Sequence, residues 1–183
     1  MHSCPLITYS IAPHAPYLYS EHALKEIHDA CEDCNTFMHI HVQETKEELE
    51  NSVQGNHEGK GCHKSQACCS PIQNMADVGS LDHACCAHCV HVLDSDIVLL
   101  AQHHASVVHC PSSNMKLGSG IAPVQRMLDQ GVNVCLGTDG ASSNNNLDML
   151  HEMRTAALLG PLADGDAKAV SAQTVCEAVV CYA

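Results

Sequence analysis

The stretch from Val132 to Asn146 has the sequence VNVCLGTDGASSNNN, and it decides the fold class of this chain. An apolar run of strand type, Val132 to Gly137, leads into Asp139, and a loop rich in glycine, serine and asparagine follows. In folds built on parallel strands, active sites gather at the carboxyl ends of the strands. The stretch therefore predicts a strand that presents Asp139 to a catalytic or binding site.

A second strand with polar residues at its end comes earlier in the chain. Residues Phe37 to Gln43 form an apolar run that contains His39 and His41, and Glu44 follows it. Because alternate side chains of a strand share a face, both histidines point the same way, and His41 lies nearer the carboxyl end. We therefore expect His41 to be the ligand candidate at the site and His39 to fill a deeper layer of the interior. Glu44 lies where the strand passes into the loop, so its side chain can turn over a bound substrate. The alternative is that Glu44 belongs to the start of the next helix.

Strands and helices alternate along most of the chain. Short apolar runs predict strands at 5–12, 37–43, 84–92, 105–110 and 132–137. Helical spacing and capping residues predict helices at 20–34, 45–52, 94–103, 123–130, 147–159 and 167–180, with Gly160-Pro161 stopping the fifth. The run from Pro111 to Asn114 and the glycine-containing loop after it join the fourth strand to its helix. This alternation predicts an α/β fold with a parallel sheet.

Residues 55–82 interrupt the pattern. Gly55, Gly59 and Gly61 lie there among polar residues and cysteines without periodicity, so we expect a long irregular loop. A chain of 183 residues has the length of one domain, and we expect a single domain over 1–183.

The charge balance limits the partners. The formal net charge is −13, with only 8 Lys and Arg, whereas nucleic-acid grooves and anionic membrane surfaces are bound by clustered positive charge. The sequence contains no run of roughly 18 apolar residues that could span a membrane, and it does not start with a signal peptide. We therefore expect a cytoplasmic protein with a small-molecule substrate, no nucleic acid and no membrane partner.

Cysteine and histidine are unusually frequent, at 13 and 15 residues. Without a secretory signal most of the thiols should be reduced. One interpretation is a metal-binding protein that uses the local cluster Cys62, His63, Cys68, Cys69, Cys85, Cys86 and Cys89. Zinc modules usually show two regularly spaced pairs, which this cluster lacks. Cys31 and Cys34 form a further pair on a predicted helix, where one of them can pack inward as a small hydrophobic residue.

Imidazoles and carboxylates at neighbouring strand ends are the ligands of a divalent metal that activates water. Such a metal lowers the pKa of its water to around 7. His88, in the strand-end segment AHCVH (87–91), is a further candidate for this site. In this interpretation Asp139 ligates the metal and accepts the water proton, Glu44 protonates a ring nitrogen or leaving group, and His88 orients the water.

Five segments carry a resemblance to a known family. They are APHAPY (12–17), HIHVQET (39–45), AHCVH (87–91), VHCPSSNMKLGSG (108–120) and LGTDG (136–140). In content and order they resemble the amidohydrolase superfamily, most closely its methylthioadenosine/S-adenosylhomocysteine deaminases and triazine hydrolases. The resemblance covers most of residues 5 to 160.

The resemblance implies a partial metal-dependent (β/α)8 TIM barrel, with the strands here corresponding to the fourth through the eighth. It implies His41 and Asp139 as metal ligands and Glu44, His88 and Asp139 as catalytic residues. His14 and Ser143 match substrate-binding positions, and Asn114 matches a pocket loop without an assigned role. Zinc is the implied cofactor, with iron or manganese as alternatives. The implied reaction is hydrolytic deamination of a heterocycle such as an adenine-type nucleoside.

One family feature has no counterpart. The family's first strand supplies a His-x-His pair to the metal, and no strand precedes the one containing Ile7. His39 and His41 are not that pair, because Glu44 and their position mark them as the fifth-strand motif. The second hypothesis is therefore a truncated, catalytically inactive fragment that serves in interaction or assembly. Self-association as a homo-oligomer fits this hypothesis, since an incomplete sheet exposes edges that can pair.

Overall fold

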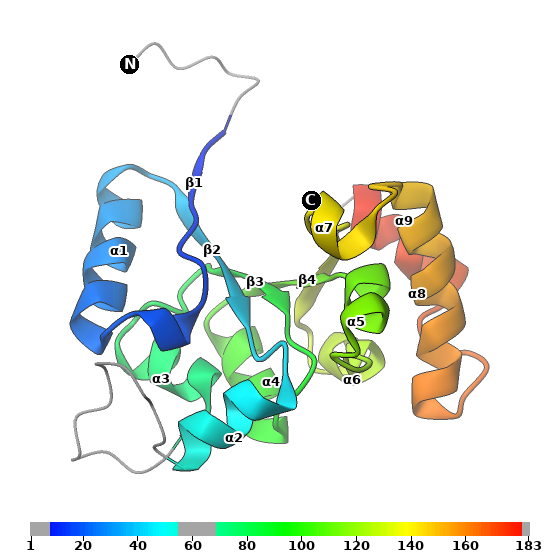
Figure 1. The fold of residues 1–183 in the computed structure, drawn as a ribbon, viewed down its shortest axis with the longest axis horizontal. Coiled ribbons are helices and arrows are strands. Elements are labelled where there is room, and N and C mark those ends of the chain that lie inside the picture. The colour runs from blue at the N-terminus through cyan, green and yellow to red at the C-terminus, as the bar shows by residue number, and fades with distance from the viewer. Residues whose placement is uncertain (1–7, 55–68, 181–183) are drawn as a thin grey trace.

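Five parallel strands form one sheet in the order β1-β2-β3-β4-β5 (Figure 1). They are β1 (Ser10–Ile11), β2 (Phe37–Val42), β3 (Cys85–His88), β4 (Ser106–His109) and β5 (Asn133–Leu136). The structure is a computed structural model, and it describes residues 8–54 and 69–180. All five strands fall within predicted runs, and the sheet is parallel as predicted. The predicted residues Pro5, Leu6 and Ile7 of the first strand lie outside the described residues.

One or more helices follow each strand in the chain. They are η1 (Pro16–Leu18), α1 (Glu21–Asp33), α2 (Lys46–Gln54), α3 (Pro71–Asp77), α4 (Asp94–Gln102), α5 (Pro111–Leu117), α6 (Val124–Asp129), α7 (Ala141–Asn144), α8 (Met149–Asp164) and α9 (Ala172–Val180). Ser20 caps α1 as predicted, since its Oγ accepts a hydrogen bond from the Ala23 N–H at 3.2 Å. In the described part of the chain, no helix has the length and apolar character needed to cross a membrane.

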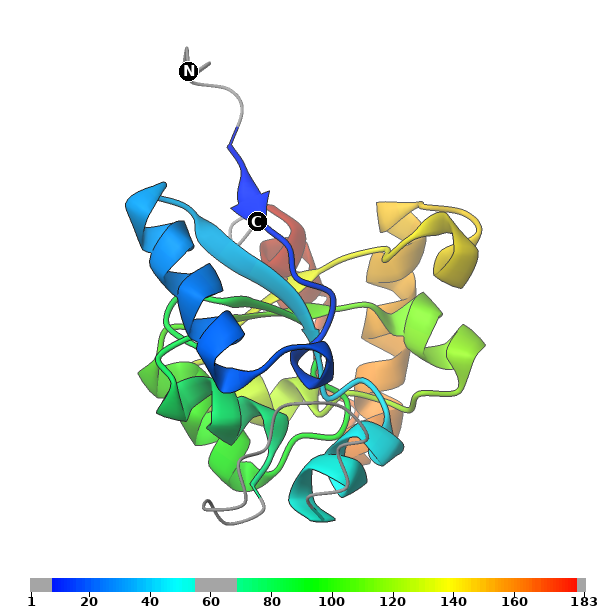
Figure 2. The same ribbon diagram turned by 60° about the vertical axis from the view of Figure 1, so that its left-hand side comes forward.

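The two faces of the sheet differ. On one face Met38, Ile40 and Val42 of β2 are buried in a core with residues of α1, α3, α4, α6 and α9 (Figure 2). On the other face His41 is half-buried, and His39 is exposed rather than buried in a deeper interior layer. Sequential strand order with the core on a single face is the winding of a barrel segment, not of a doubly wound sheet.

Three short helices replace predicted irregular structure. α5 and α7 occupy segments expected to be loops, and α3 lies inside the interval expected to be irregular. Residues 55–68 of that interval are outside the described part. α3 and α5 both begin at a proline in the first turn, and α5 ends at Gly118 with φ of 69°. These helices have 7 residues or fewer, which is too short for their spacing to be recognised.

The prediction that Gly160-Pro161 stops a helix was wrong. α8 continues to Asp164 and ends at Gly165, whose φ of 66° lies in the left-handed region that favours glycine. Gly160 is instead a position of close packing. A Cβ built at Gly160 would lie 2.4 Å from the Cβ of Val170, in the segment that leads to α9. The glycine therefore permits close packing between α8 and the chain that follows it.

We predict that Gly160→Ala destabilises the protein. At an ordinary helix position alanine is more stable than glycine by about 1 kcal/mol. Here the added methyl group meets the branched carbon of Val170, and such overpacking costs about 1–3 kcal/mol, so the net effect should be a lower free energy of unfolding. Urea unfolding followed by circular dichroism measures the change.

The matched control is the same substitution combined with Val170→Gly. This second change removes the carbon that collides and relieves a branched residue held at φ of 48°. Relative to Val170→Gly alone, Gly160→Ala should then be neutral or stabilising. An unchanged or higher stability of the single variant Gly160→Ala would contradict the packing argument.

Candidate metal centre and active site

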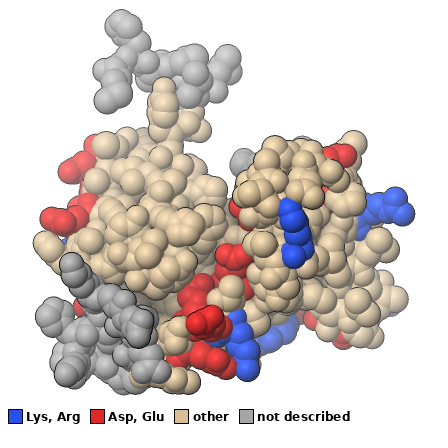
Figure 3. Space-filling view, in the orientation of Figure 1, with Lys and Arg blue, Asp and Glu red and all other residues tan. Residues whose placement is uncertain are grey.

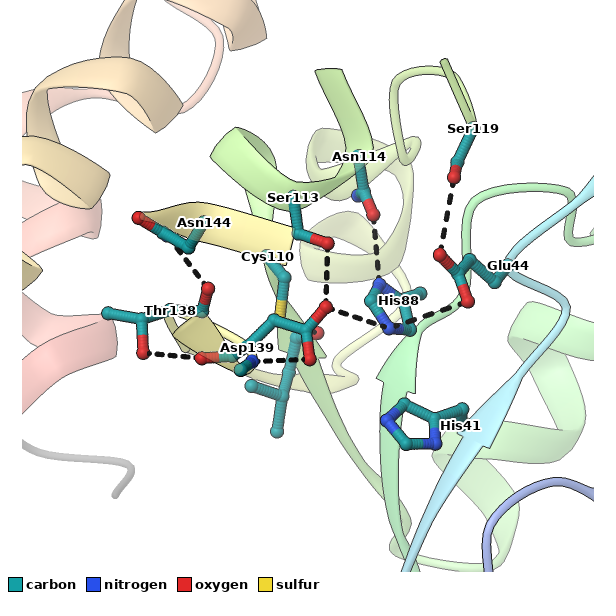
Figure 4. Close-up of polar contacts among 12 residues, drawn as sticks. His41, Glu44, His88, Cys110, Ser113, Asn114, Ser119, Thr138, Asp139 and Asn144 are labelled. Carbon is teal, nitrogen blue, oxygen red and sulfur yellow. Dashed lines mark hydrogen bonds and ion pairs between the residues drawn. The ribbon is translucent and has the colours of Figure 1, made fainter. Parts of the chain in front are cut away.

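The carboxyl ends of β2 and β3 and the loop after β5 bring His41, His88 and Asp139 together (Figure 4). One potential ligand atom from each residue lies within 4.8 Å of the others. The rings of His41 and His88 stack with centroids 5.4 Å apart, and His88 Nε2 is 4.0 Å from Asp139 Oδ2. Within residues 8–54 and 69–180 this is the one group of three or more His, Cys, Asp or Glu side chains with such spacing.

The backbone leaves the extended conformation where these side chains are presented. Gln43, His88 and Asp139 have φ of 50°, 74° and 61°, in the left-handed region. His88 pairs with Val42, whose side chain is buried in the core, so regular alternation would turn His88 away from His41. The left-handed turn brings its ring back to the site. The sequence names His88 as a candidate but does not indicate this turn.

His41 is oriented for metal binding through one nitrogen. Its Nδ1 lies 2.7 Å from the carbonyl oxygen of His14. Because a carbonyl only accepts hydrogen bonds, Nδ1 carries the proton, and Nε2 keeps a free lone pair. The ring of His14 packs edge-on against His41, with centroids 4.9 Å apart. The structure thus brings the predicted substrate-side residue His14 next to the site.

His88 is held by a residue to which the sequence gave no role. Its Nδ1 lies 2.9 Å from Oδ1 of Asn114, and each of the two residues is 1% exposed. With the amide oxygen as acceptor, Nδ1 is the donor, and Nε2 faces the site. Glu44 Oε2 lies 3.8 Å from that Nε2. Asn114 is placed here by α5, so recognising this short helix in the sequence would have linked Asn114 to the site.

Asp139 accepts two hydrogen bonds. Ser113 Oγ donates to Oδ2 at 2.6 Å, and the Gly140 N–H donates to Oδ1 at 2.7 Å. Burial alone would raise the pKa of Asp139, but these bonds and the nearby His88 and His41 rings lower it below its ordinary value. The carboxylate is therefore ionised at neutral pH. Ser113 is a second contact that sequence reasoning missed.

Glu44 is fixed through both its backbone and its carboxylate. Its N–H donates to Glu48 Oε2 at 3.0 Å, and Ser119 Oγ donates to its Oε1 at 3.3 Å. α2 begins at Lys46, so Glu44 lies before the helix and is not part of its first turn. The carboxylate that accepts the backbone N–H groups before the helix belongs to Glu48 and not to Glu44. Glu44 remains free to face the site.

The site lies in an acidic hollow. Figure 3 shows Asp and Glu side chains along a hollow between the part of the molecule that carries α1 and the part that carries α7 and α8. Glu44 and Asp139 are partly exposed, with 24% and 18% of their side chains accessible. Ser143, the other predicted substrate-side residue, lies on α7, the helix that follows Asp139.

The cysteines in the described residues do not form a comparable group. Cys86 and Cys89 are completely buried, and burial, with the neighbouring Cys86 and Cys135, raises the pKa of Cys85 to about 12. Cys31 is buried and Cys34 is exposed, which agrees with the prediction that one cysteine of this pair packs inward. Of the predicted thiol cluster, Cys62, His63 and Cys68 lie outside the described residues.

The donors fit a divalent cation. Two imidazoles with free nitrogens and an ionised carboxylate are ligands that zinc accepts, and they leave open positions for water or substrate. The acidic hollow adds a favourable potential for a cation. Ligand type and spacing therefore agree with the predicted metal centre.

Several known proteins are similar to this chain. A methylthioadenosine/S-adenosylhomocysteine deaminase of Teredinibacter turnerae is 44% identical over 175 residues, which are 94% of this chain and 37% of that protein. A 5'-deoxyadenosine deaminase of Methanothrix thermoacetophila is 42% identical, with 93% of this chain and 39% of that protein covered. The chain thus spans less than two fifths of the length of these relatives.

Solved structures show the same fold. An adenosine deaminase from Xanthomonas campestris with bound zinc superposes with a TM-score of 0.87 and 34% identity, over 97% of this chain and 38% of that one. An atrazine chlorohydrolase from Arthrobacter aurescens, complexed with zinc, superposes with a TM-score of 0.79 over 92% and 35%. The atrazine chlorohydrolase is 22% identical to this chain, so its likeness shows a shared fold and no more.

The profile of one protein family covers nearly the whole chain. It matches residues 4–177, a range that includes all five strands and all the side chains of the site. The fold is the corresponding segment of the metal-dependent barrel, and this chain belongs to the amidohydrolase family.

Proposed function

We propose that this chain carries the proton-transferring and part of the metal-binding machinery of a hydrolytic deaminase for adenine-type nucleosides. The observation that carries the proposal is the convergence of His41, His88 and Asp139 next to Glu44. Relatives that are 40–44% identical bear the names of deaminases for 5-methylthioadenosine and S-adenosylhomocysteine or for 5'-deoxyadenosine. These relatives favour an adenine ring over a triazine as the substrate.

His41 and Asp139 are the proposed metal ligands, and zinc is the proposed metal. When bound there, a divalent metal would lower the pKa of a water molecule toward 7 and so supply a nucleophile. The contact of His41 Nδ1 with the His14 carbonyl leaves Nε2 as the nitrogen that can ligate the metal, and the carboxylate of Asp139 is ionised at neutral pH. His88, with Nδ1 bound to Asn114, turns Nε2 toward the same space and orients the attacking water.

Glu44 and Asp139 divide the proton transfers. Hydrolytic deamination adds water to the ring carbon that carries the amino group, protonates a ring nitrogen and releases ammonia. Glu44, held by Ser119 and Glu48, is the proposed acid that protonates the ring nitrogen. Asp139 accepts one proton of the water and passes it to the departing amino group, and the second proton leaves the oxygen as the carbonyl forms and restores the acid form of Glu44. His14 and Ser143 are the proposed contacts to the substrate beyond its ring.

We predict that the chain binds zinc stoichiometrically and that Asp139→Ala and His41→Ala each abolish this binding. Each substitution removes one of two proposed ligands, so the remaining groups cannot hold the ion. Zinc content after dialysis, measured by atomic emission, tests the prediction. His22→Ala, which removes an exposed histidine of α1, is the matched control and should retain zinc.

The thiol interpretation is tested in the same experiment. Replacing Cys62, Cys68 and Cys69 by serine should leave zinc binding unchanged if His41 and Asp139 hold the metal. Loss of zinc in the serine variant, with retention in Asp139→Ala, would instead locate the metal at the thiol cluster.

We predict that Glu44→Gln lowers deamination by about 10²–10⁴-fold, as loss of a general acid does, while zinc binding is retained. The loss of adenine ultraviolet absorbance on incubation with methylthioadenosine measures the rate. Glu47→Gln, on the first turn of α2, is the control for removing a carboxylate and should keep the activity. A Glu44→Gln variant as active as the unchanged chain would exclude the proposed acid.

The alternative function is an inactive fragment that acts in assembly. It is favoured by the sheet itself, which ends at β1 and β5 without closing in the described residues. Zinc binding without turnover, together with concentration-dependent association in sedimentation experiments, would support this alternative over catalysis by the chain alone.

A further inference from the structure

A buried carboxylate lies behind the site and belongs to none of the roles above. Glu152, in the first turn of α8, is 0% exposed. Among the described residues no Lys, Arg or His forms an ion pair with it. A buried carboxylate is unfavourable unless donors satisfy it, so its hydrogen bonds should show what it holds in place.

One oxygen of Glu152 holds α5. The Ser112 N–H, in the first turn of α5, donates to Oε2 at 3.1 Å. The next two residues of the helix are those that contact the site, since Ser113 donates to Asp139 and Asn114 accepts from His88. The position of this helix end therefore sets both contacts.

The other oxygen of Glu152 holds the loop that presents Asp139. The side-chain amide of Asn144 donates to Oε1 at 2.8 Å and also to the carbonyl oxygen of Thr138 at 2.7 Å. Thr138 immediately precedes Asp139. Figure 4 shows the contact of Asn144 with Thr138. The Asn144 oxygen in turn accepts the N–H groups of Asn146 and Leu147 at 3.2 and 3.3 Å, which closes the loop.

We propose that Glu152 is a positioning residue that fixes His88 and Asp139 relative to each other from a common point on α8. One carboxylate reaches α5 through Ser112 and the loop after β5 through Asn144. The proposal deepens the proposed function, because it concerns the geometry of the same metal centre. A carboxylate is required since both oxygens accept. The amide of a glutamine has only one acceptor oxygen, so its NH2 group would face either the Ser112 N–H or the Asn144 NH2, which are both donors.

Asp96 provides a comparison within the same protein. It is also buried, at 1% exposure, and accepts from the Leu93 N–H and from Gln43 Nε2 at 2.8 and 3.0 Å. Ser70 Oγ donates to its other oxygen. These partners lie around α3, α4 and the end of β2, away from α5 and the loop after β5. Loss of the Asp96 charge should therefore disturb the core without moving the His88 contact.

The test compares Glu152→Gln with Asp96→Asn in the full chain. The first readout is the imidazole NMR spectrum of the metal-free protein labelled with ¹⁵N-histidine. Its His88 Nδ1–H signal is identified by its loss in Asn114→Ala. The second readout is zinc affinity by competition with a chelating dye. Thermal unfolding of each variant reports the general loss of stability.

We expect Glu152→Gln to shift or remove the His88 Nδ1–H signal and to weaken zinc binding by about 10–100-fold, the usual effect of losing support behind a metal ligand. Asp96→Asn should leave the His88 signal in place at a comparable loss of thermal stability. Asn144→Ala removes the contacts of Asn144 with Glu152 and with the loop after β5, but it leaves the bond between Glu152 and the Ser112 N–H. This variant should therefore weaken zinc binding and keep the His88 signal.

The outcomes separate this inference from the proposed function. If the unchanged chain binds no zinc, the metal site fails, while the His88 signal in Glu152→Gln still decides the role of Glu152. An unaltered His88 signal in Glu152→Gln would overturn the inference, as would the same loss of that signal in Asp96→Asn. Should Glu152→Gln fail to fold, zinc binding by Asn144→Ala at full strength would overturn it as well.

Discussion

The parallel pairing of β2 through β5 is the constraint on which the site depends. Because the strands run in the same direction and in sequential order, their carboxyl ends meet at one edge of the sheet. His41, His88 and Asp139 come from positions separated by 47 and 51 residues, and only this pairing brings them within ligand distance. A shift of one residue in the pairing of a strand would turn its side chains to the opposite face.

Regular strand geometry is not sufficient to build the site. At Gln43, His88 and Asp139 the backbone adopts positive φ, which costs about 1–3 kcal/mol for a residue other than glycine. The cost is offset by contacts that fix each turn. Glu48 accepts the Gln43 N–H, Asn114 binds the His88 ring, and Ser113 with Gly140 binds Asp139. Backbone strain and precise side-chain contacts thus occur at the same positions.

Much of the framework could be predicted from the sequence. The five strands and α1 follow from apolar runs and from the capping Ser20, which are local signals. His41 and Asp139 could be named because strand ends in parallel sheets are functional positions. Roles for Glu44 and His88 could be proposed from the chemistry of metal-activated water, and the resemblance to amidohydrolases implied the same two residues.

The remaining features depend on contacts between distant residues. Ser113, Asn114 and Glu152 act across about 25 to 40 positions of sequence, and no local pattern indicates such partners. α5 and α7 are too short for helical spacing to be evident. At Gly160 a local signal for a helix end was misleading, because the glycine is required by packing against Val170. Tertiary structure overrides local preference at these points.

The burial of the thiols has a consequence for the chemistry of a chain so rich in sulfur. Oxidation and alkylation proceed through the thiolate, and the pKa values of Cys85, Cys89 and Cys110 are all raised. At neutral pH these side chains are almost entirely protonated, and Cys89 and Cys110 are also buried. Among the cysteines of residues 8–54 and 69–180, the exposed Cys34 and Cys176 should therefore react with peroxide or iodoacetamide before Cys85, Cys89 and Cys110 do.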